Sequence, residues 1–238
     1  MRFQGATAVV TGGGSGIGAA LARELAQRGA TPVIADRDLD RALSVARGAG
    51  GTAEHVDVSD PGSMADLADR HPDATLVFLN AGVVGSAVGA PWEVPAGEWD
   101  SVFATNVGGV VNGLRAFVPA LLRRGAQAHV VITASLAGAA VFPGGGAYGP
   151  SKHAVLAVAR HAAMALAGTP VSVHVLCPAF VRTAMSTEGI TPEEAAGHAV
   201  ALIEADRFAW VPDEWHEAVV NGGRDLVSGA RPSPPGPS

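Results

Sequence analysis

The sequence predicts a doubly wound α/β fold of the Rossmann type, a three-layer sandwich with about seven parallel strands between helices. Short apolar runs alternate with longer helical segments along the 238 residues, and this alternation is typical of repeated strand–helix–strand units. Each run is almost continuously apolar, as strands buried on both faces of a parallel sheet are. Since we find no internal repeat or linker, we expect a single domain over residues 1–230.

Six strands are expected before residue 180, as short runs rich in apolar residues: Ala6–Thr11, Thr31–Asp36, Ala53–Asp57, Ala74–Asn80, Ala128–Ser135 and Val171–Leu176. The helices expected between them are Gly16–Arg28, Leu39–Arg47, Pro61–Arg70, Trp99–Arg124 and Tyr148–Ala167. The Pro/Ser-rich tail, residues 231–238, is expected to be disordered because such a composition cannot build a packed core.

The composition narrows the class of protein. A net charge of −6 argues against nucleic acid or an anionic membrane surface as a partner. Cys177 is the only cysteine, which excludes an intrachain disulfide and fits a reducing compartment. The apolar stretches are shorter than the roughly 18 residues of a membrane span, and no targeting segment is visible. We therefore expect a cytoplasmic protein, and we assign no metal site.

The glycine-rich segment TGGGSGIG, residues 11–18, ends the first predicted strand and opens a helix. Glycines let the backbone turn sharply and approach a ligand closely, and a helix start offers free N–H groups and a positive dipole end to a pyrophosphate. A plain strand–helix turn is the alternative, but the place of the loop after the first strand predicts a dinucleotide site. Its candidate residues are Gly12, Ser15, Gly16, Ile17 and Gly18.

The second predicted strand ends at Asp36, whose carboxylate can accept hydrogen bonds from both adenosine ribose hydroxyls and would repel a 2′-phosphate. The neighbouring Arg37 could instead bind that phosphate. Because the glycine loop holds no basic residue to assist, we expect NAD in preference to NADP.

Two further loops are expected at the same crevice, because ligands of such sheets lie across the carboxyl ends of the strands. Asp57 and Val58 follow the third strand, and Asp57 could accept a hydrogen bond from the adenine amino group. Asn80, Ala81 and Gly82 follow the fourth strand and would let the backbone pass close to the adenosine half. Both loops could also be ordinary turns, since Asn, Asp and Gly are common turn formers.

Tyr148 and Lys152 are the only tyrosine and the only lysine of the chain, and they stand four residues apart. On a helix such residues share a face, so we expect the ammonium to lower the pKa of the phenol, ordinarily about 10. That would make Tyr148 a proton donor and acceptor near neutral pH. Ser135 ends the fifth strand, and Asn106 stands mid-helix, where asparagine needs a hydrogen-bonding task to be favourable.

Together these motifs resemble the short-chain dehydrogenase/reductase family in their order and spacing, over roughly residues 3–185. The resemblance implies that Tyr148 is the general acid in carbonyl reduction and the base in alcohol oxidation, while Lys152 lowers its pKa and binds the nicotinamide ribose. It implies that Ser135 hydrogen-bonds the substrate oxygen, and that Asn106 holds a helix distortion and a water linking Lys152 to solvent.

The resemblance also extends to a loop after the sixth strand, Pro178-Ala-Phe-Val-Arg-Thr183. It implies that this loop positions the nicotinamide carboxamide, through the backbone of Val181 and the hydroxyl of Thr183, with Pro178 and Ala179 also at the cofactor. The family usually has glycine where this chain has Ala179, which should leave the loop usable. Residues 212–238 match no part of the family's pattern.

These observations predict an NAD(H)-dependent oxidoreductase that interconverts a secondary alcohol and a ketone. The residues expected at the substrate are apolar and favour a neutral, hydrophobic compound: Val84, Leu136, Phe142, Phe180 and Met185. The segment after Thr183 is short, which would leave the site open. An NADPH-dependent ketoreductase is the alternative, and a non-catalytic dinucleotide-binding sensor or scaffold is an alternative of another class.

The helix expected over Tyr148–Ala167 is rich in alanine and apolar on most of its circumference. A helix of this kind is buried on more than one side, and only one side can pack on the sheet. We therefore expect a homodimer or homotetramer whose interface includes this helix.

Overall fold

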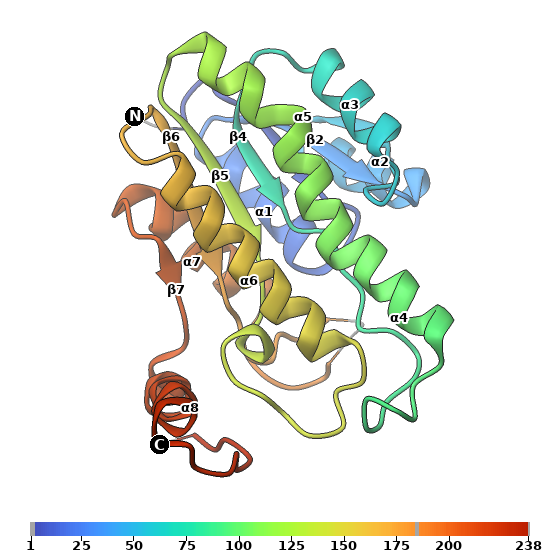
Figure 1. Ribbon diagram of the computed structural model, residues 1–238. Helices are drawn as coiled ribbons and strands as arrows, with labels where there is room; N and C mark the ends of the chain where they lie inside the picture. The colour runs from blue at the N-terminus through green and yellow to red at the C-terminus, as the bar shows by residue number, and fades with distance from the viewer. Residues whose placement is uncertain (1–2, 184–185, 238) are drawn as a thin grey trace.

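The computed structural model describes residues 3–183 and 186–237, and its centre is a sheet of seven parallel strands between two layers of helices (Figure 1). The strands are β1 (Thr7–Thr11), β2 (Thr31–Asp36), β3 (Thr52–His55), β4 (Ala74–Leu79), β5 (Ala128–Thr133), β6 (Val171–Leu176) and β7 (Ala209–Trp210). Their order is β3-β2-β1-β4-β5-β6-β7, so the direction of winding reverses between β1 and β4. The predicted doubly wound fold is confirmed.

The strands are apolar at consecutive positions because both faces of the sheet are covered. In β1, Val9 packs into the core on one face, while Ala8 and Val10 pack into the core on the other. All six residues of β5 are buried. The almost continuous apolar runs of the sequence follow from this double burial.

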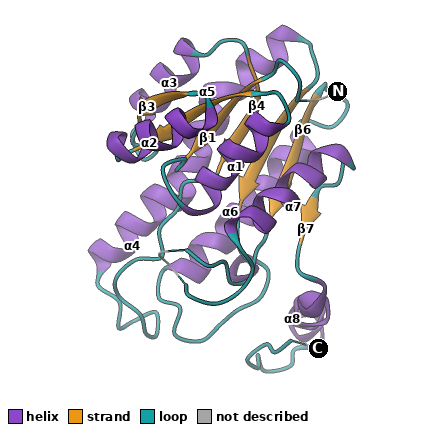
Figure 2. Ribbon diagram, turned by 180° about the vertical axis from the view of Figure 1, so that it is seen from behind, coloured by secondary structure: helices purple, strands orange, loops and turns teal. Residues whose placement is uncertain are grey.

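The helices are α1 (Gly16–Gln27), α2 (Leu39–Ala49), α3 (Pro61–Arg70), α4 (Ala96–Phe103), α5 (Gly109–Arg124), α6 (Tyr148–Ala165), α7 (Pro192–Glu204) and α8 (His216–Ser228). Helices α3, α5 and α6 cover one face of the sheet, and α1, α2 and α7 cover the other (Figure 2). In the part of the chain that the structure describes, no helix combines the length and the apolar character needed to traverse a bilayer.

Side chains at the helix starts fix where several helices begin. Asp38 and Asp60 accept hydrogen bonds from the first backbone N–H groups of α2 and α3. Thr191 and Glu194 form a reciprocal capping box at α7, directly before Pro192. Each such cap typically contributes about 1 kcal/mol.

The six predicted strands are present, but several end earlier than expected. β3 ends at His55 rather than at Asp57, and β5 ends at Thr133 rather than at Ser135. Ser135 leaves the strand because its hydroxyl accepts a hydrogen bond from the N–H of Ala137 and starts a short 3₁₀ turn. α7, β7 and α8 were not among the elements assigned from the sequence.

The helix predicted over Trp99–Arg124 begins earlier and is not continuous. α4 begins at Ala96, and a π-helical turn over Ala104–Gly108 separates it from α5. The turn is centred on the buried Asn106, whose side chain bonds the neighbouring loop instead of facing solvent. The helix distortion that the family resemblance implies is therefore present.

α8 stands clear of both helical layers, beyond β7 (Figure 1). None of its residues is buried. The segment that leads into it does contact the body of the protein, because the ring of Trp215 packs edge-on against Phe142 at 5.5 Å between ring centroids.

Candidate active site

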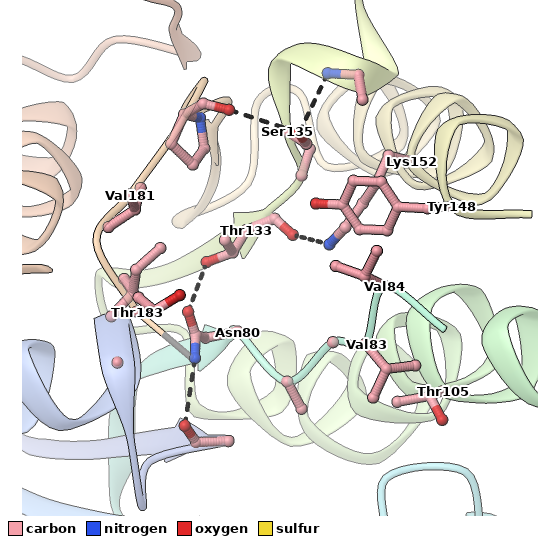
Figure 3. A pocket seen from close by; sticks show the side chains of 18 of the residues that line it. Asn80, Val83, Val84, Thr105, Thr133, Ser135, Tyr148, Lys152, Val181 and Thr183 are labelled. Carbon is pink, nitrogen blue, oxygen red and sulfur yellow. Dashed lines mark hydrogen bonds between the residues drawn. The ribbon is translucent and has the colours of Figure 1, made fainter. Parts of the chain in front are cut away.

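A cavity of about 650 Å³ lies at the carboxyl edge of the sheet, lined by residues that end or follow β1 to β6 and by the start of α6. Figure 3 shows side chains from these segments converging on it. Every site residue predicted from the sequence lines this cavity except three. Gly18 and Asn106 are not part of its lining, and Met185 falls outside the described residues.

Two glycines of the loop stand where a side chain would not fit. Gly12 has a positive φ of 63°, and a Cβ there would lie 2.8 Å from the Cα of Ala81. A Cβ on Gly18 would lie 2.1 Å from the carbonyl oxygen of Gly12. Such distances exclude a side chain, so the glycines let the loop pass under the cavity and open α1 towards it. The start of α1 fits the pyrophosphate of a dinucleotide.

Asp36 at the end of β2 is held by backbone groups. One carboxylate oxygen accepts a hydrogen bond from Gly14 N at 2.8 Å, and the other accepts from Asp38 N at 2.9 Å. The carboxylate therefore joins the glycine loop to the end of β2, with lone pairs left to accept ribose hydroxyls.

Arg37 and Arg41 line the cavity beside Asp36. The guanidinium of Arg41 is paired with Asp38 at 3.0 Å. Arg41 was not predicted from the sequence because it stands in the first turn of α2, beyond the end of β2 at Asp36.

The carboxylate of Asp57 is hydrogen-bonded within its own loop. Its Oδ1 accepts hydrogen bonds from the N–H and the hydroxyl of Ser59, at 2.9 and 2.6 Å. Both bonds lower the pKa of the Asp57 carboxyl below its ordinary value, and the bond from the Ser59 hydroxyl contributes most. Asp57 and Val58 both line the cavity, so the predicted adenine contact remains sterically open.

Tyr148 opens α6, and Lys152 follows on the same face with its Nζ 5.7 Å from the centroid of the phenol ring. Lys152 is buried at 4% exposure, and its Nζ donates a hydrogen bond to the carbonyl oxygen of Thr133 at 2.9 Å. Burial lowers the pKa of Lys152 from 10.5 to about 8. The predicted sharing of a helix face is confirmed by this geometry.

The expected lowering of the Tyr148 pKa is wrong for the chain by itself. Burial of the phenol raises its pKa above 10, and the interaction with the Ser135 hydroxyl offsets only part of this. Lys152 has little influence because its ammonium is turned to the carbonyl of Thr133. Helical spacing alone could not reveal that a strand carbonyl would compete for the ammonium.

Ser135 stands between the end of β5 and the loop after β6. Its hydroxyl accepts from Ala137 N at 3.1 Å and lies 3.5 Å from the carbonyl oxygen of Pro178. The residue is 6% exposed, and it lines the cavity together with Tyr148. A carbonyl oxygen bound there can receive hydrogen bonds from a hydroxyl and a phenol at once.

Asn106 supports the site from behind the cavity wall. Its amide accepts from Val83 N at 2.8 Å and donates to Val83 O and to the hydroxyl of Ser151, both at 2.9 Å. It therefore ties the loop after β4 to α6. A Cβ on Gly82 would lie 3.2 Å from the Asn106 Oδ1 and 3.3 Å from the Lys152 Nζ, so Gly82 separates the two groups.

The loop after β6 forms the opposite wall. Pro178, Ala179, Val181 and Thr183 all line the cavity. Thr183 lies over the glycine loop, since a Cβ on Gly16 would meet its Cγ2 at 3.1 Å.

The substrate end of the cavity is mainly apolar. Val84, Leu136, Phe142 and Phe180 line it as predicted, and sequence reasoning missed several neighbours, namely Thr105, Thr133, Ala134, Ala137, Gly145, Gly149 and Ser186. Most of these are small residues, which carry no functional group that would mark them in the sequence. Of these residues, Thr133 is bonded both to Asn80 and to Lys152.

Comparison with known proteins agrees with this geometry. The family model for short chain dehydrogenases matches residues 6–194. A 1-deoxy-11-beta-hydroxypentalenate dehydrogenase from Streptomyces avermitilis is 44% identical over 219 residues, which cover 88% of this chain and 80% of the relative. A D-beta-hydroxybutyrate dehydrogenase from Rhizobium meliloti is 32% identical over 79% of this chain and 80% of its own length.

Among solved structures, a short chain dehydrogenase/reductase from Burkholderia phymatum in complex with NAD superposes with a TM-score of 0.92 at 31% identity, and the match covers 100% of both chains. A levodione reductase has a TM-score of 0.79 at 25% identity, over 86% of this chain and 93% of its own.

Proposed function

The chain belongs to the short-chain dehydrogenase family, and we propose that it interconverts a secondary alcohol and a ketone with NAD(H), using Tyr148 as the general acid and base. One observation carries the proposal: Ser135, Tyr148 and Lys152 line the same cavity as the glycine loop and Asp36. When bound, the nicotinamide cofactor supplies or accepts the hydride.

The residues of this chain would position the substrate and move the proton. Ser135 would donate a hydrogen bond to the carbonyl oxygen and stabilise the charge that develops on it. Tyr148 would give its phenolic proton to that oxygen during reduction and take it back during oxidation. Lys152 would keep its bond to the strand carbonyl and direct its other N–H groups towards Tyr148 and the ribose, where its charge favours the phenolate.

Asp36 supports NAD as the cofactor, because its carboxylate can accept hydrogen bonds from the ribose hydroxyls and would repel a 2′-phosphate. Arg37 and Arg41 favour the second candidate, an NADPH-dependent ketoreductase, since both line the same end of the cavity. The ratio of kcat/KM for the two cofactors separates them. We keep the prediction of a homodimer or homotetramer, and the mass in solution tests it.

We propose a neutral, hydrophobic alcohol as substrate. Among the described residues of the cavity lining, the cations are Arg37 and Arg41 at the adenosine end and Lys152, which is bonded to Thr133. The substrate end therefore presents apolar walls to the ligand. The names of the two relatives point to hydroxy acids, so a substrate panel should pair each neutral alcohol with a carboxylate of similar size.

The Tyr148→Phe variant tests the proposal. It should lose about 10²–10⁴-fold in kcat, the usual contribution of a general acid or base, while it binds NADH as the wild type does.

In the wild type, the rate of alcohol oxidation should increase and the rate of ketone reduction should decrease as the pH rises. The reason is that the raised pKa of Tyr148 keeps the phenol protonated at neutral pH. Full activity of the phenylalanine variant would overturn the assigned role.

A further inference from the structure

A continuous chain of hydrogen bonds runs from the glycine loop to the catalytic end of the cavity (Figure 3). The Asn80 Nδ2 donates to the carbonyl oxygen of Thr11 at 3.1 Å, directly before the first glycine of the loop. The Asn80 Oδ1 accepts from the hydroxyl of Thr133 at 3.1 Å. The carbonyl of Thr133 in turn accepts from the Nζ of Lys152 at 2.9 Å.

The donor and the acceptor of each hydrogen bond in this series can be assigned. The Asn80 amide cannot be reversed, because its oxygen would then face the carbonyl oxygens of Thr11 and Gly12, and the latter lies 3.4 Å from the Nδ2. The oxygen must therefore accept, and the Thr133 hydroxyl must donate. Thr11 is 1% exposed, and its hydroxyl accepts the backbone N–H of Asn80 at 3.0 Å.

We propose that Thr133 is a positioning residue, which holds the Lys152 ammonium and the glycine loop in one hydrogen-bonded arrangement. Binding of a ligand at the loop would then change the environment of the Lys152 ammonium. The inference rests on the proposed function, since Lys152 serves catalysis there through Tyr148. Thr133 is suited to this task because its side chain bonds one neighbour while its backbone carbonyl bonds the other. It is 8% exposed, so water competes little for either bond.

The composition of the chain provides a direct readout. Lys152 is the only lysine, so protein labelled with [ε-¹³C]lysine gives one side-chain NMR signal whose titration reports the pKa of this ammonium alone. The Thr133→Val variant keeps the shape of the side chain and removes the hydroxyl. Without the bond to Asn80 the strand end is less fixed, the ammonium loses an ordered acceptor, and the pKa of Lys152 should fall below the wild-type value of about 8.

The turnover of the Thr133→Val variant should also show the loss of positioning. In Thr133→Val we expect kcat to fall roughly tenfold, with the pH profile of kcat displaced and the KM for NAD changed by less than about twofold, because positioning and not cofactor contact is lost. Thr133→Ser keeps the hydroxyl and should restore the titration and most of kcat. Thr31→Val, at an exposed threonine that begins β2, should leave both unchanged.

A measurement on the wild type decides the matter even if Thr133→Val does not fold. ADP can occupy the glycine-loop end of the cavity but has no nicotinamide half to reach Lys152. Saturating ADP should move the Lys152 signal in the wild type and in Thr133→Ser, and should leave it in place in a folded Thr133→Val. A wild-type signal that ADP does not move would overturn the inference, as would a folded Thr133→Val with wild-type titration and kcat.

The two proposals fail in different ways. If the wild type binds neither ADP nor NADH, or oxidises no alcohol, the proposed function is wrong. If the wild type binds and turns over while Thr133→Val loses only thermal stability, Thr133 is a structural residue and the inference alone is wrong.

Discussion

Replacement of the buried ammonium of Lys152 by an uncharged side chain should stabilise the fold at neutral pH while abolishing activity. The Lys152→Met variant keeps a similar length and can fill the same space. Burial lowers the pKa of Lys152 from 10.5 to about 8, which means that the folded chain holds this proton less firmly than the unfolded chain does.

The magnitude follows from this difference of about 2.5 between the two pKa values. At about 1.4 kcal/mol per tenfold change in proton affinity, the buried charge costs the folded state about 3 kcal/mol. Below pH 8 both states carry the charge, and the folded state bears the whole of this cost. Between pH 8 and pH 10.5 the unfolded chain binds the proton and the folded chain does not. The free energy of unfolding of the wild type therefore increases with pH in this range.

Methionine also loses the bond to the carbonyl of Thr133, a cost of about 1 kcal/mol that does not depend on pH. Urea unfolding should therefore find Lys152→Met about 2 kcal/mol more stable than the wild type at pH 7 and about 1 kcal/mol less stable at pH 10.5. Cys177 is the ionisable group coupled to Lys152, and burial raises its pKa to about 11, above this range, so the difference mainly reports Lys152.

Arg47→Met, which removes an exposed cation from α2, is the matched control, and its stability difference from the wild type should stay within about 0.5 kcal/mol at both pH values. A Lys152→Met difference that stays constant from pH 7 to pH 10.5 would refute the reasoning, because it would mean that the ammonium is not penalised by burial.

Three further substitutions test the cavity. Asp36→Ser should lower the NAD-to-NADP ratio of kcat/KM by at least about tenfold, since it removes the charge that repels a 2′-phosphate. Gly18→Ala should weaken NADH binding at least about tenfold in a fluorescence titration, because its Cβ would lie 2.1 Å from the Gly12 carbonyl oxygen and overpacking of this kind costs about 1–3 kcal/mol. Trp215→Ala should lower kcat/KM several-fold for a bulky ring alcohol and little for a small one, because the indole supports Phe142 at the substrate end.

Gly18→Ala and Trp215→Ala each have a matched control in the chain. Gly97→Ala in α4 meets open space and should leave NADH binding unchanged. Trp92→Ala removes an indole that is 85% exposed and should not discriminate between alcohols of different size. If Gly97→Ala weakened binding as much as Gly18→Ala, or if Trp92→Ala matched Trp215→Ala, the local packing argument would be wrong.

The fold could be predicted because its strands are buried on both faces, which leaves apolar runs such as residues 76–79 that can be recognised without knowledge of tertiary contacts. Strand ends were less accessible to prediction. Ser135 leaves the ladder through a bond to Ala137 N, and such local competition does not alter the apolar pattern. β7 has two residues, which is too short to show any period.

The site was predictable where chemistry is tied to spacing along one element, as for Tyr148 and Lys152. It was not predictable where two elements meet. Thr133 gives no signal as a strand threonine, and its importance comes from the Asn80 side chain on the adjacent β4 loop and from an ammonium on α6. For the same reason the sequence could not show that the Lys152 ammonium is bonded to the carbonyl of Thr133.

The π-helical turn at Ala104–Gly108 bears on how this chain can change in length. A π turn accommodates one residue more than the α-helix does. In an uninterrupted α-helix that extra residue would rotate everything beyond it by about 100° around the helix axis, whereas the π turn absorbs it and leaves both Val102 on α4 and Phe117 on α5 buried. A deletion of one residue here would restore a continuous α-helix and keep both side chains buried, but it would remove the turn that places Asn106 against Val83. The length of this turn should therefore matter more for the site than for the stability of the fold.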